Sequence, residues 1–523
     1  MAATHSVALD GLTGRPIEVE VDINSGMPGT VVVGLADTIV NEARDRVRAA
    51  VVNSGTAWPD QRVTINLAPS NVPKTGSHFD LAIAVGLCVA KRVVPAETLG
   101  DAVLLGELAL DGRLRAVRGV LPATMAAAAA GYTRIFVPES NASEAALVPD
   151  IEVIGLRSLR QLVARLTGEP EPEDPPVPPL DEAMFDVQDP QLVGLDVADV
   201  AGQEDARTAM LVAAVGGHHL ALTGPPGIGK TMLAKRIPGL LPDLSDTDAL
   251  EVSAVHSVGG MLPADAPLLR RPPFIDPHHT SSAVAIIGGG TRGIRPGAMS
   301  LAHRGVLFMD EAPEFASNVL DALRQPLESG RVLIARANQT AVFPAKFQLV
   351  LASNPCPCGQ SGSVADQCQC TPVMRRRYHD RISGPIRDRI DIHRSLTLPT
   401  RPELARAIGR SRTTQQLAEL VATARDRQSS RLAGTPWRLN SDVPGSELRK
   451  RWPVDGIARR ILDGHVGGPK LSARAADRVL ALAWSVADLC RHDQPSRDDT
   501  VLALALRQGM PLGPDLRELV AAS

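Results

Sequence analysis

Aromatic side chains are scarce in this sequence of 523 residues, because Phe, Tyr and Trp together make up only 3% of it. Hydrophobic residues account for 44% of the chain, so its cores have to be built mainly from Ala, Val, Leu and Ile. A chain of this length is expected to form about three or four domains. The composition therefore indicates a multidomain globular protein with aliphatic cores.

The chain also has little net charge and few cysteines. A formal net charge of −3 excludes a globally basic nucleic-acid-binding protein, so any contact with DNA has to come from local basic patches. Six cysteines are too few to form a disulfide scaffold in a chain this long. The low cysteine count argues against a secreted, disulfide-stabilised protein.

Long apolar runs are missing as well. No run reaches the roughly 18 residues that a membrane-spanning helix needs. Residues 1–14 have neither the basic start nor the apolar stretch of a signal peptide. We therefore expect a cytoplasmic protein that has no membrane partner.

Proline marks the clearest boundary along the chain. Residues 169–182 have the sequence EPEPEDPPVPPLDE, and six of the ten residues from 170 to 179 are proline. Such a segment cannot form a core and is typical of a stiff, extended spacer. We expect four parts: an N-terminal α/β domain over 1–168, a proline-rich acidic linker over 169–190, a second α/β domain over 191–400 and a helical domain over 401–523.

The most informative motif is a glycine-rich loop in the second α/β domain. It follows the pattern G-x-x-x-x-G-K-[ST] and consists of Gly224, Pro225, Pro226, Gly227, Ile228, Gly229, Lys230 and Thr231. The apolar run 220–222 before the loop indicates a buried strand, and residues 232–236 after it start a helix. In this setting backbone N–H groups cradle the phosphates of ATP, Lys230 places a positive charge on them, and the Thr231 hydroxyl binds Mg²⁺.

Two further strands bring polar side chains to the same sheet edge. The apolar run 306–309 leads directly into Asp310 and Glu311, as when a buried strand delivers carboxylates to the edge of a parallel sheet. Asp310 would hold Mg²⁺ through water, and Glu311 would polarise the attacking water. The strand-like run 348–353 ends at Asn354, whose amide can orient that water; a simple Asn-Pro turn is the alternative.

The order of these motifs resembles that of AAA+ ATPases, and two arginines extend the resemblance. Residues 383–391, SGPIRDRID, resemble the arginine-finger segment of magnesium-chelatase-like AAA+ proteins, with Arg389 in the matching place. The resemblance implies that Arg389 neutralises γ-phosphate charge in a neighbouring subunit, and hence a ring. Arg387 stands where the family usually has an apolar residue, so both arginines are candidates. Residues 471–475, LSARA, resemble the sensor-2 motif and place Arg474 in the first turn of the lid helix.

Further motifs narrow the resemblance to the YifB/ComM family of magnesium-chelatase-like AAA+ ATPases. In chain order they are PHHT at 277–280, IGGG at 287–290, RPG at 295–297, SLAH at 300–303 and LRQPLE at 323–328. The resemblance covers nearly the whole chain. It implies an ATP- and Mg²⁺-dependent motor that forms a homo-oligomeric, hexameric ring and acts on single-stranded or branched DNA, as a helicase or in branch migration.

The family resemblance also implies two insertions in the core that face the channel of the ring. One is a Gly-rich loop at about 281–297. The other, 330–347, has β-type residues on both sides of a turn near 336–338, which predicts a β-hairpin. Arg336 at its tip is a candidate contact for DNA phosphates, and a merely solvated arginine is the alternative.

Four of the six cysteines form two C-x-C pairs that nine residues separate: Cys356, Cys358, Cys368 and Cys370. Four thiolates within one loop can close a tetrahedral Zn²⁺ site. The C-x-C spacing is less usual than C-x-x-C, so a redox pair or uncoordinated thiols are alternatives. A zinc ion here would be structural and would brace the loop between Asn354 and the arginine-finger segment.

The N-terminal region alternates strand and helix patterns over 15–165. It resembles the N-terminal domain of the same family in three runs, GLAD at 34–37, NLAP at 66–69 and GELALDG at 106–112. The resemblance implies a ribosomal S5 domain 2-like fold, which Lon protease shares. Lon cleaves with a Ser–Lys dyad, but His78 occupies the serine slot and residues 117–122 contain no lysine. We therefore expect a scaffold or a DNA contact.

The expected fold is multidomain α/β, with an S5 domain 2-like (Lon-like) N-terminal domain, an AAA+ P-loop NTPase core and a C-terminal helical lid. Two rivals to a DNA motor share this ATPase chemistry. One is a chelatase-type motor that drives a partner to insert a metal into a porphyrin, and the other is a protein-remodelling ATPase without nucleic acid. A DNA-stimulated ATPase rate favours the DNA motor, whereas a porphyrin-chelatase partner encoded alongside favours the first rival.

Overall fold

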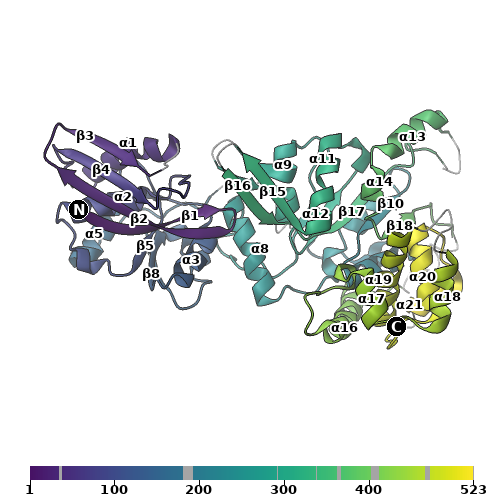
Figure 1. Ribbon diagram of the computed structural model, residues 1–523. Coiled ribbons are helices and arrows are strands. Elements are labelled where there is room, and N and C mark those ends of the chain that lie inside the picture. The colour runs from purple at the N-terminus through teal and green to yellow at the C-terminus, as the bar shows by residue number, and fades with distance from the viewer. Residues whose placement is uncertain are drawn as a thin grey trace.

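The computed structural model describes residues 1–34, 38–180, 192–290, 293–336, 339–361, 367–401, 411–465 and 472–521. These residues form an N-terminal mixed sheet, a central parallel sheet and a C-terminal group of helices (Figure 1). None of their helices is both long and apolar enough to cross a membrane. Some sequence predictions fall outside these residues, namely those for 35–37, 181–190, 362–366, 402–410 and 471.

The N-terminal region is a seven-stranded sheet with the strand order β3-β4-β2-β1-β5-β8-β9. Its strands are β1 (Ala2–Asp10), β2 (Thr13–Asn24), β3 (Gly29–Val33), β4 (Arg62–Ala68), β5 (Ala102–Leu104), β8 (Arg134–Pro138) and β9 (Glu152–Leu156). β2 pairs antiparallel with both β1 and β4, and the other neighbours are parallel. The short strands β6 (Glu107–Leu108) and β7 (Leu114–Arg115) form a separate pair.

Five helices accompany this sheet: α1 (Thr38–Asn53), α2 (Asp80–Ala90), α3 (Val120–Ala129), α4 (Ala142–Ala145) and α5 (Leu159–Thr167). α2 is buried along nearly its whole length, as its almost continuous apolar sequence requires. α5 begins where the Ser158 hydroxyl accepts a hydrogen bond from the Gln161 N–H, and it ends at the left-handed Gly168. Helices α1, α2 and α5 share one aliphatic core with the sheet, and α3 and α4 share a second one with it.

Residues 169–180, the first part of the predicted linker, form no helix or strand and stay against the N-terminal region. Asp174 pairs with Arg160, and Glu171 Oε1 lies 2.6 Å from Arg165 Nε, so two acidic side chains attach to α5. Val177 is buried in the N-terminal core. The proline-rich segment is therefore fastened to the domain that precedes it.

The central sheet has five parallel strands in the order β11-β14-β17-β10-β18. They are β10 (Leu220–Thr223), β11 (Phe274–Ile275), β14 (Val306–Met309), β17 (Gln348–Ser353) and β18 (Ile392–Ser395). All four residues of β14 are buried, as expected for a strand covered on both faces. The strands predicted at 220–222, 306–309 and 348–353 are confirmed. Because β14, β17 and β10 are parallel neighbours, the residues that follow them meet at one edge.

The helices of this region are α6 (Glu204–Gly216), α7 (Lys230–Ala234), α8 (Asp246–Gly259), α9 (Ala283–Ile287), α10 (Ala298–Leu301), α11 (Ser317–Ala322), α12 (Arg324–Ser329), α13 (Pro372–Asp380) and α14 (Gly384–Arg387). The predicted hairpin is confirmed as β15 (Arg331–Arg336) and β16 (Gln339–Pro344). The predicted loop at 281–297 instead contains α9, which the Ser282 hydroxyl caps, and the pair β12 (Gly288–Gly289) and β13 (Arg295–Pro296).

The C-terminal helices are α16 (Thr414–Leu432), α17 (Gly445–Arg451), α18 (Gly456–His465), α19 (Ala473–Leu489), α20 (Arg497–Gln508) and α21 (Pro514–Ala521). The predicted helix at 473–489 is confirmed. Its apolar face shares one core with α6 and the central sheet. In this core the Ser485 hydroxyl lies 2.7 Å from His218 Nε2, so a buried polar contact also joins the two regions.

The N-terminal and central regions meet where α3 packs beside α8 (Figure 1). The Leu121 N–H donates to Ser257 Oγ over 3.4 Å, and the Gly119 N–H donates to the Ser257 carbonyl over 3.1 Å. Leu121, Val148 and Ala254 form a small apolar cluster at this contact. The two regions therefore share a packed interface rather than a linker alone.

Candidate nucleotide site

The glycine-rich loop between β10 and α7 has a backbone conformation that requires glycine at two positions. Gly227 and Gly229 have φ angles of 75° and 96°, in the left-handed region that side chains disfavour. A Cβ atom at Gly224 would lie 3.0 Å from the Leu396 carbonyl oxygen, whereas no atom of a described residue outside the adjoining loop lies within 4 Å of one at Gly227. The loop therefore leaves its Gly227 backbone open, as close approach by a phosphate requires.

Lys230 joins this loop to the end of β17. Its ammonium Nζ donates to the carbonyl oxygens of Gly224 and Pro225, at 2.7 and 3.0 Å, and to Asn354 Oδ1 at 3.0 Å. Burial lowers the pKa of Lys230, while the carboxylates of Asp310 and Glu311 oppose the shift. The structure thus brings Asn354, which is distant in sequence, to the phosphate loop.

Asp310 and Glu311 follow β14 on the same edge. The Thr231 hydroxyl donates to Asp310 Oδ2 over 2.6 Å, and the Glu311 N–H donates to Asp310 Oδ1 over 2.9 Å. Glu311 has a φ of 50°, an uncommon left-handed conformation for a residue with a side chain. Such conformations gather at functional sites, where surrounding contacts hold them. The Asp310 carboxylate therefore contacts Thr231, whereas the Glu311 carboxylate contacts His279.

His279 is a site residue to which the sequence predictions assign no role. Its Nδ1 lies 3.3 Å from Glu311 Oε2, and its ring meets the Phe315 ring edge-on at a centroid distance of 6.5 Å. The side chains of Glu311 and His279 are 50% and 30% exposed, so solvent reaches both. The PHHT motif was the available signal, but nothing in its local sequence links it to an acidic residue on another strand.

The oxygen atoms at this edge fit a magnesium-bound nucleoside triphosphate. Thr231 and Asp310 place a hydroxyl and a carboxylate side by side, which is the kind of ligand set that Mg²⁺ takes together with phosphate oxygens. The Lys230 ammonium and the open Gly227 backbone lie on the same loop. The loop and its neighbours therefore hold the kinds of groups that phosphate and Mg²⁺ require of a binding site.

The two predicted catalytic arginines lie together at Glu328, at the end of α12. Arg389 pairs with the Glu328 carboxylate, and Arg474 Nη2 lies 3.7 Å from Glu328 Oε1. Burial lowers the pKa of Arg389, and the positive charges of Arg474, Arg478 and Arg324 lower it further. Among the described residues no hydrogen bond or ion pair joins Arg389 or Arg474 to the phosphate loop.

The other candidate finger, Arg387, has a different environment. Its Nη2 lies 3.4 Å from Asp380 Oδ1, and its side chain is 47% exposed, compared with 7% for Arg389. A buried arginine that other arginines surround is electrostatically costly, and an additional anion would relieve that cost. This environment favours Arg389 over Arg387 as the phosphate contact.

Comparison with known proteins agrees with these motifs. Models of the magnesium chelatase subunit ChlI match residues 196–403 and 19–141, and a model of the ChlI C-terminal part matches residues 411–507. These matches show a magnesium-chelatase-like protein.

Full-length relatives carry this assignment. An uncharacterised protein of Mycobacterium tuberculosis is 46% identical over 97% of this chain and 99% of its own length. YifB of Escherichia coli is 39% identical, and competence protein ComM of Haemophilus influenzae is 38% identical, each over 97% of both chains. The chain belongs to the YifB/ComM family of magnesium-chelatase-like AAA+ proteins. Membership of this family suggests ATPase activity and oligomerisation.

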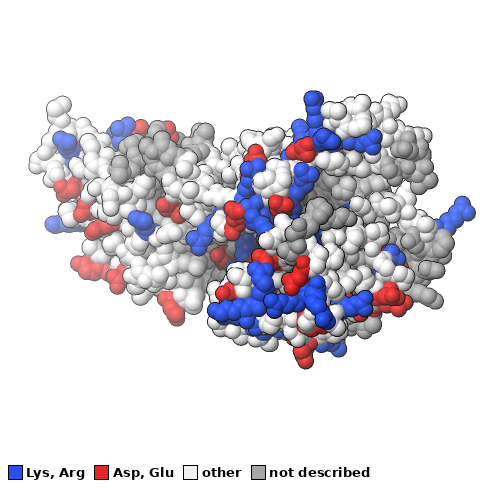
Figure 2. Space-filling view, turned by 45° about the vertical axis from the view of Figure 1, so that its right-hand side comes forward, with Lys and Arg blue, Asp and Glu red and all other residues white. Residues whose placement is uncertain are grey.

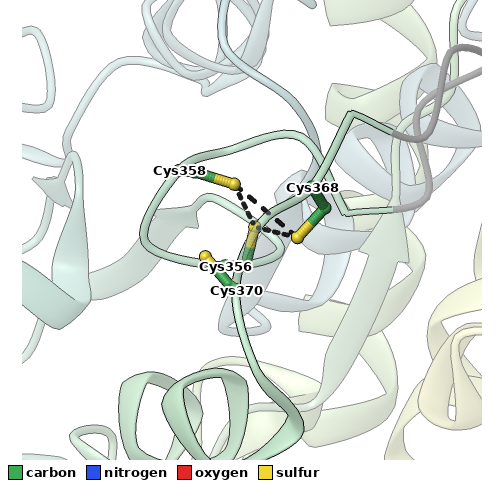
Figure 3. Close-up of side chains that lie close together, drawn as sticks. All are labelled: Cys356, Cys358, Cys368 and Cys370. Atoms are coloured by element: carbon green, nitrogen blue, oxygen red, sulfur yellow. Dashed lines mark hydrogen bonds between the residues drawn. The ribbon is translucent and has the colours of Figure 1, made fainter.

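The four clustered cysteines of this family member also come together in space. Cys356, Cys358, Cys368 and Cys370 all place their sulfur atoms within 4.8 Å of one another (Figure 3). The segment that carries them begins two residues after Asn354 and ends where α13 begins. The cluster therefore lies in the chain between one predicted catalytic residue and the arginine-finger segment.

The predicted DNA contact stays a prediction, because the Arg336 side chain lies outside the described part of the chain. The hairpin that carries it buries Val332, Ala341 and Phe343 and exposes Leu333 and Val342. Figure 2 shows Lys and Arg side chains gathered over the central and C-terminal regions, with Asp and Glu among them. On this face the charges form no uniform basic surface, in agreement with the low net charge.

Proposed function

We propose that this protein is a Mg²⁺-dependent ATPase that assembles into a hexameric ring and moves on single-stranded or branched DNA. The observation that carries the ATPase part is the meeting of three strand ends, where Lys230 contacts Asn354 and Thr231 contacts Asp310. Three parallel neighbours deliver these groups to the edge at which α/β proteins bind nucleotides. The DNA part rests on the resemblance to the ComM side of the family.

Each residue has a distinct task in this proposal. Lys230 holds the terminal phosphates, while Thr231 and Asp310 hold Mg²⁺, which neutralises phosphate charge when bound. Glu311 takes a proton from the attacking water, and His279 orients the Glu311 carboxylate. Asn354 sits beside Lys230 and orients the water toward the γ-phosphate. Two adjacent residues after β14 therefore have different tasks: Asp310 binds the metal and Glu311 accepts the proton.

The ring follows from the arginines. Arg389 and Arg474 share the Glu328 carboxylate in a group of arginines that has more positive than negative charge. The triphosphate of a neighbouring subunit would supply the missing negative charge, and this charge is the one an arginine finger neutralises. We assign the finger to Arg389, with Arg474 acting beside it.

In the same proposal α16–α21 form the lid, and the N-terminal region has the S5 domain 2-like fold.

The decisive experiment measures ATP turnover by the full chain without DNA and with single-stranded, duplex or branched DNA. The proposal expects turnover that single-stranded or branched DNA increases. Turnover that no DNA changes would favour the protein-remodelling function. Turnover that responds to a porphyrin-chelatase partner would favour the chelatase function, which the descriptions of the matching family models keep as the second candidate.

Arg336→Ala is expected to weaken DNA binding and DNA-stimulated turnover with little dependence on sequence. Removing one phosphate contact should reduce the slope of log affinity against log salt by about 1. Binding titrations at several salt concentrations measure that slope. Arg331→Ala, at the base of the same hairpin, is the matched control and should leave the slope unchanged. Equal slopes for wild type and Arg336→Ala would remove Arg336 from the DNA contact.

His279→Ala is expected to slow hydrolysis by about tenfold or more, because a freely rotating Glu311 carboxylate spends less time in the productive orientation. ATP affinity should stay near the wild-type value, since the described contacts of His279 are with Glu311 and aromatic rings and not with the phosphate loop. Steady-state kinetics separate the two effects as kcat and KM. A variant with normal kcat would show that His279 does not position Glu311.

A further inference from the structure

The cysteine cluster has the geometry of a metal site rather than of scattered thiols. The sulfur of Cys356 lies 3.3 Å from that of Cys358 and 3.6 Å from that of Cys368, and Cys358 and Cys368 are also 3.6 Å apart. A tetrahedral zinc site with bonds of about 2.3 Å has sulfur–sulfur edges of about 3.8 Å. Figure 3 shows the side chains turned toward one another from both arms of the segment.

Other uses of four thiols fit this arrangement less well. A disulfide needs two sulfurs at about 2.0 Å, which pairs two cysteines and gives the other two no reason to converge. All six cysteines of the chain are free thiols in this structure. Thiols held only by packing would be expected in an apolar core, as Cys88 is. The described residues around this cluster form no helix or strand, and Cys358 is exposed.

Backbone groups support thiolates at this place. The Ser361 N–H donates to Cys356 Sγ over 3.3 Å, and Cys356 is fully buried. The backbone N–H of Gln360 also donates a hydrogen bond to the sulfur of Cys358. Hydrogen bonds of this kind orient and stabilise the thiolate ligands of a metal.

We propose that Cys356, Cys358, Cys368 and Cys370 bind one zinc ion, which holds the segment between β17 and α13 in one conformation. Four sulfur ligands fill a tetrahedral zinc site and leave no coordination position for water, so the metal is structural and not catalytic. The ligand set suits zinc and iron alike, and zinc is the ion that serves structure without redox chemistry. Metal binding is the source of order in this segment, because its described residues form no helix or strand.

The metal-bound segment reaches the nucleotide site through its own contacts. A Cβ atom at Gly359 would lie 2.7 Å from Pro226 Cδ, so the cysteine segment packs directly on the phosphate loop. His379 Nε2 of α13 lies 3.0 Å from the Pro355 carbonyl oxygen, next to Asn354. Zinc therefore also fixes Asn354 and one side of the phosphate loop. This last step rests on the proposed nucleotide function, whereas metal binding does not.

Metal analysis of the full chain, purified without chelators or a metal-binding tag, tests the site. The expected result is about one zinc per chain. Cobalt exchanged into the site should give the strong visible absorption of a tetrahedral cobalt thiolate, a signal that needs no activity. Cys356→Ser and Cys370→Ser should lose the metal, and Cys490→Ser, whose thiol contacts the Leu519 carbonyl, should keep it. A content of about one iron per chain would overturn the zinc site. So would a chain without metal in which the four cysteines form disulfides or titrate as free thiols.

A second measurement tests the link to the nucleotide site and separates it from the first. A mercurial reagent should release the zinc, and the zinc-free chain should bind ATP about tenfold more weakly and lose resistance to proteolysis at residues 367–371. Release of zinc without any change in ATP affinity would overturn the bracing step alone. A chain that carries one zinc but binds no ATP under any condition would overturn the proposed function and leave the zinc site standing.

Discussion

Glu311→Gln is expected to stop ATP hydrolysis while ATP stays bound. The amide has nearly the size of the carboxylate but cannot accept a proton from water, so only the proton-transfer step is lost. General-base catalysis contributes on the order of 10²–10⁴ to the rate, and kcat should fall by about that factor. ATP affinity should persist, because Lys230, Thr231 and Asp310 keep their contacts. Steady-state turnover and binding of a fluorescent ATP analogue measure the two effects separately.

A matched control lies three residues further along the same turn. Glu314→Gln removes an acid whose Oε2 lies 3.1 Å from Arg381 Nη1. No described hydrogen bond or ion pair joins Glu314 to the phosphate loop, so turnover should stay near the wild-type rate. If Glu311→Gln hydrolyses ATP at the normal rate, Glu311 is not the base. If both variants lose turnover, the turn after β14 is sensitive to any change and the assignment of Glu311 has no support.

The nucleotide site was largely predictable from the sequence, and the reason lies in the sheet. Each group follows a short apolar strand, and the carboxyl ends of parallel strands meet at one edge whatever the rest of the fold does. The phosphate loop after β10, Asp310 after β14 and Asn354 after β17 needed only local spacing to be found. Their contacts with Lys230 and Thr231 follow from the strand order β14-β17-β10.

Contacts made by side chains from different regions were not predictable in this way. His279 reaches Glu311 because β11, a strand of only two residues, places the PHHT motif beside β14. So short a strand has no periodicity to detect. The convergence of Arg389 and Arg474 on Glu328 depends on how α12, α14 and α19 pack, which local sequence does not encode.

Two predictions from composition missed structural detail, one for the proline-rich segment and one for the Gly-rich loop. The proline-rich segment has the composition of a stiff, extended spacer, yet Glu171 and Asp174 pair with arginines of α5. Charged residues that keep a linker soluble also find partners on a neighbouring helix. The glycines at 288–290 predicted a loop, but the apolar residues just before them form α9. Composition describes a whole segment and misses such short elements within it.

Mixing two inactive variants is expected to restore ATPase activity if Arg389 serves the neighbouring subunit. Lys230→Ala removes the phosphate contact but keeps the finger, and Arg389→Ala does the reverse. Each variant alone should lose activity by a factor on the order of 10³, which is the lower end of the effect that an arginine finger has on kcat. In rings mixed at random from equal amounts, about a quarter of the interfaces combine an intact loop with an intact finger, if the ring is head-to-tail. The mixture should therefore regain a clear fraction of wild-type turnover.

The mixing experiment also decides between the two candidate arginines. Arg387 pairs with Asp380 at the surface, so Arg387→Ala should keep most of its own activity, whereas Arg389→Ala should need an intact partner. Co-purification through a tag on one variant shows that the rings are mixed. No recovery in such rings at any ratio would contradict a finger that acts between subunits. Recovery by Arg387→Ala mixtures, with Arg389→Ala active alone, would move the finger to Arg387 and leave the buried Arg389 with only its structural pairing to Glu328.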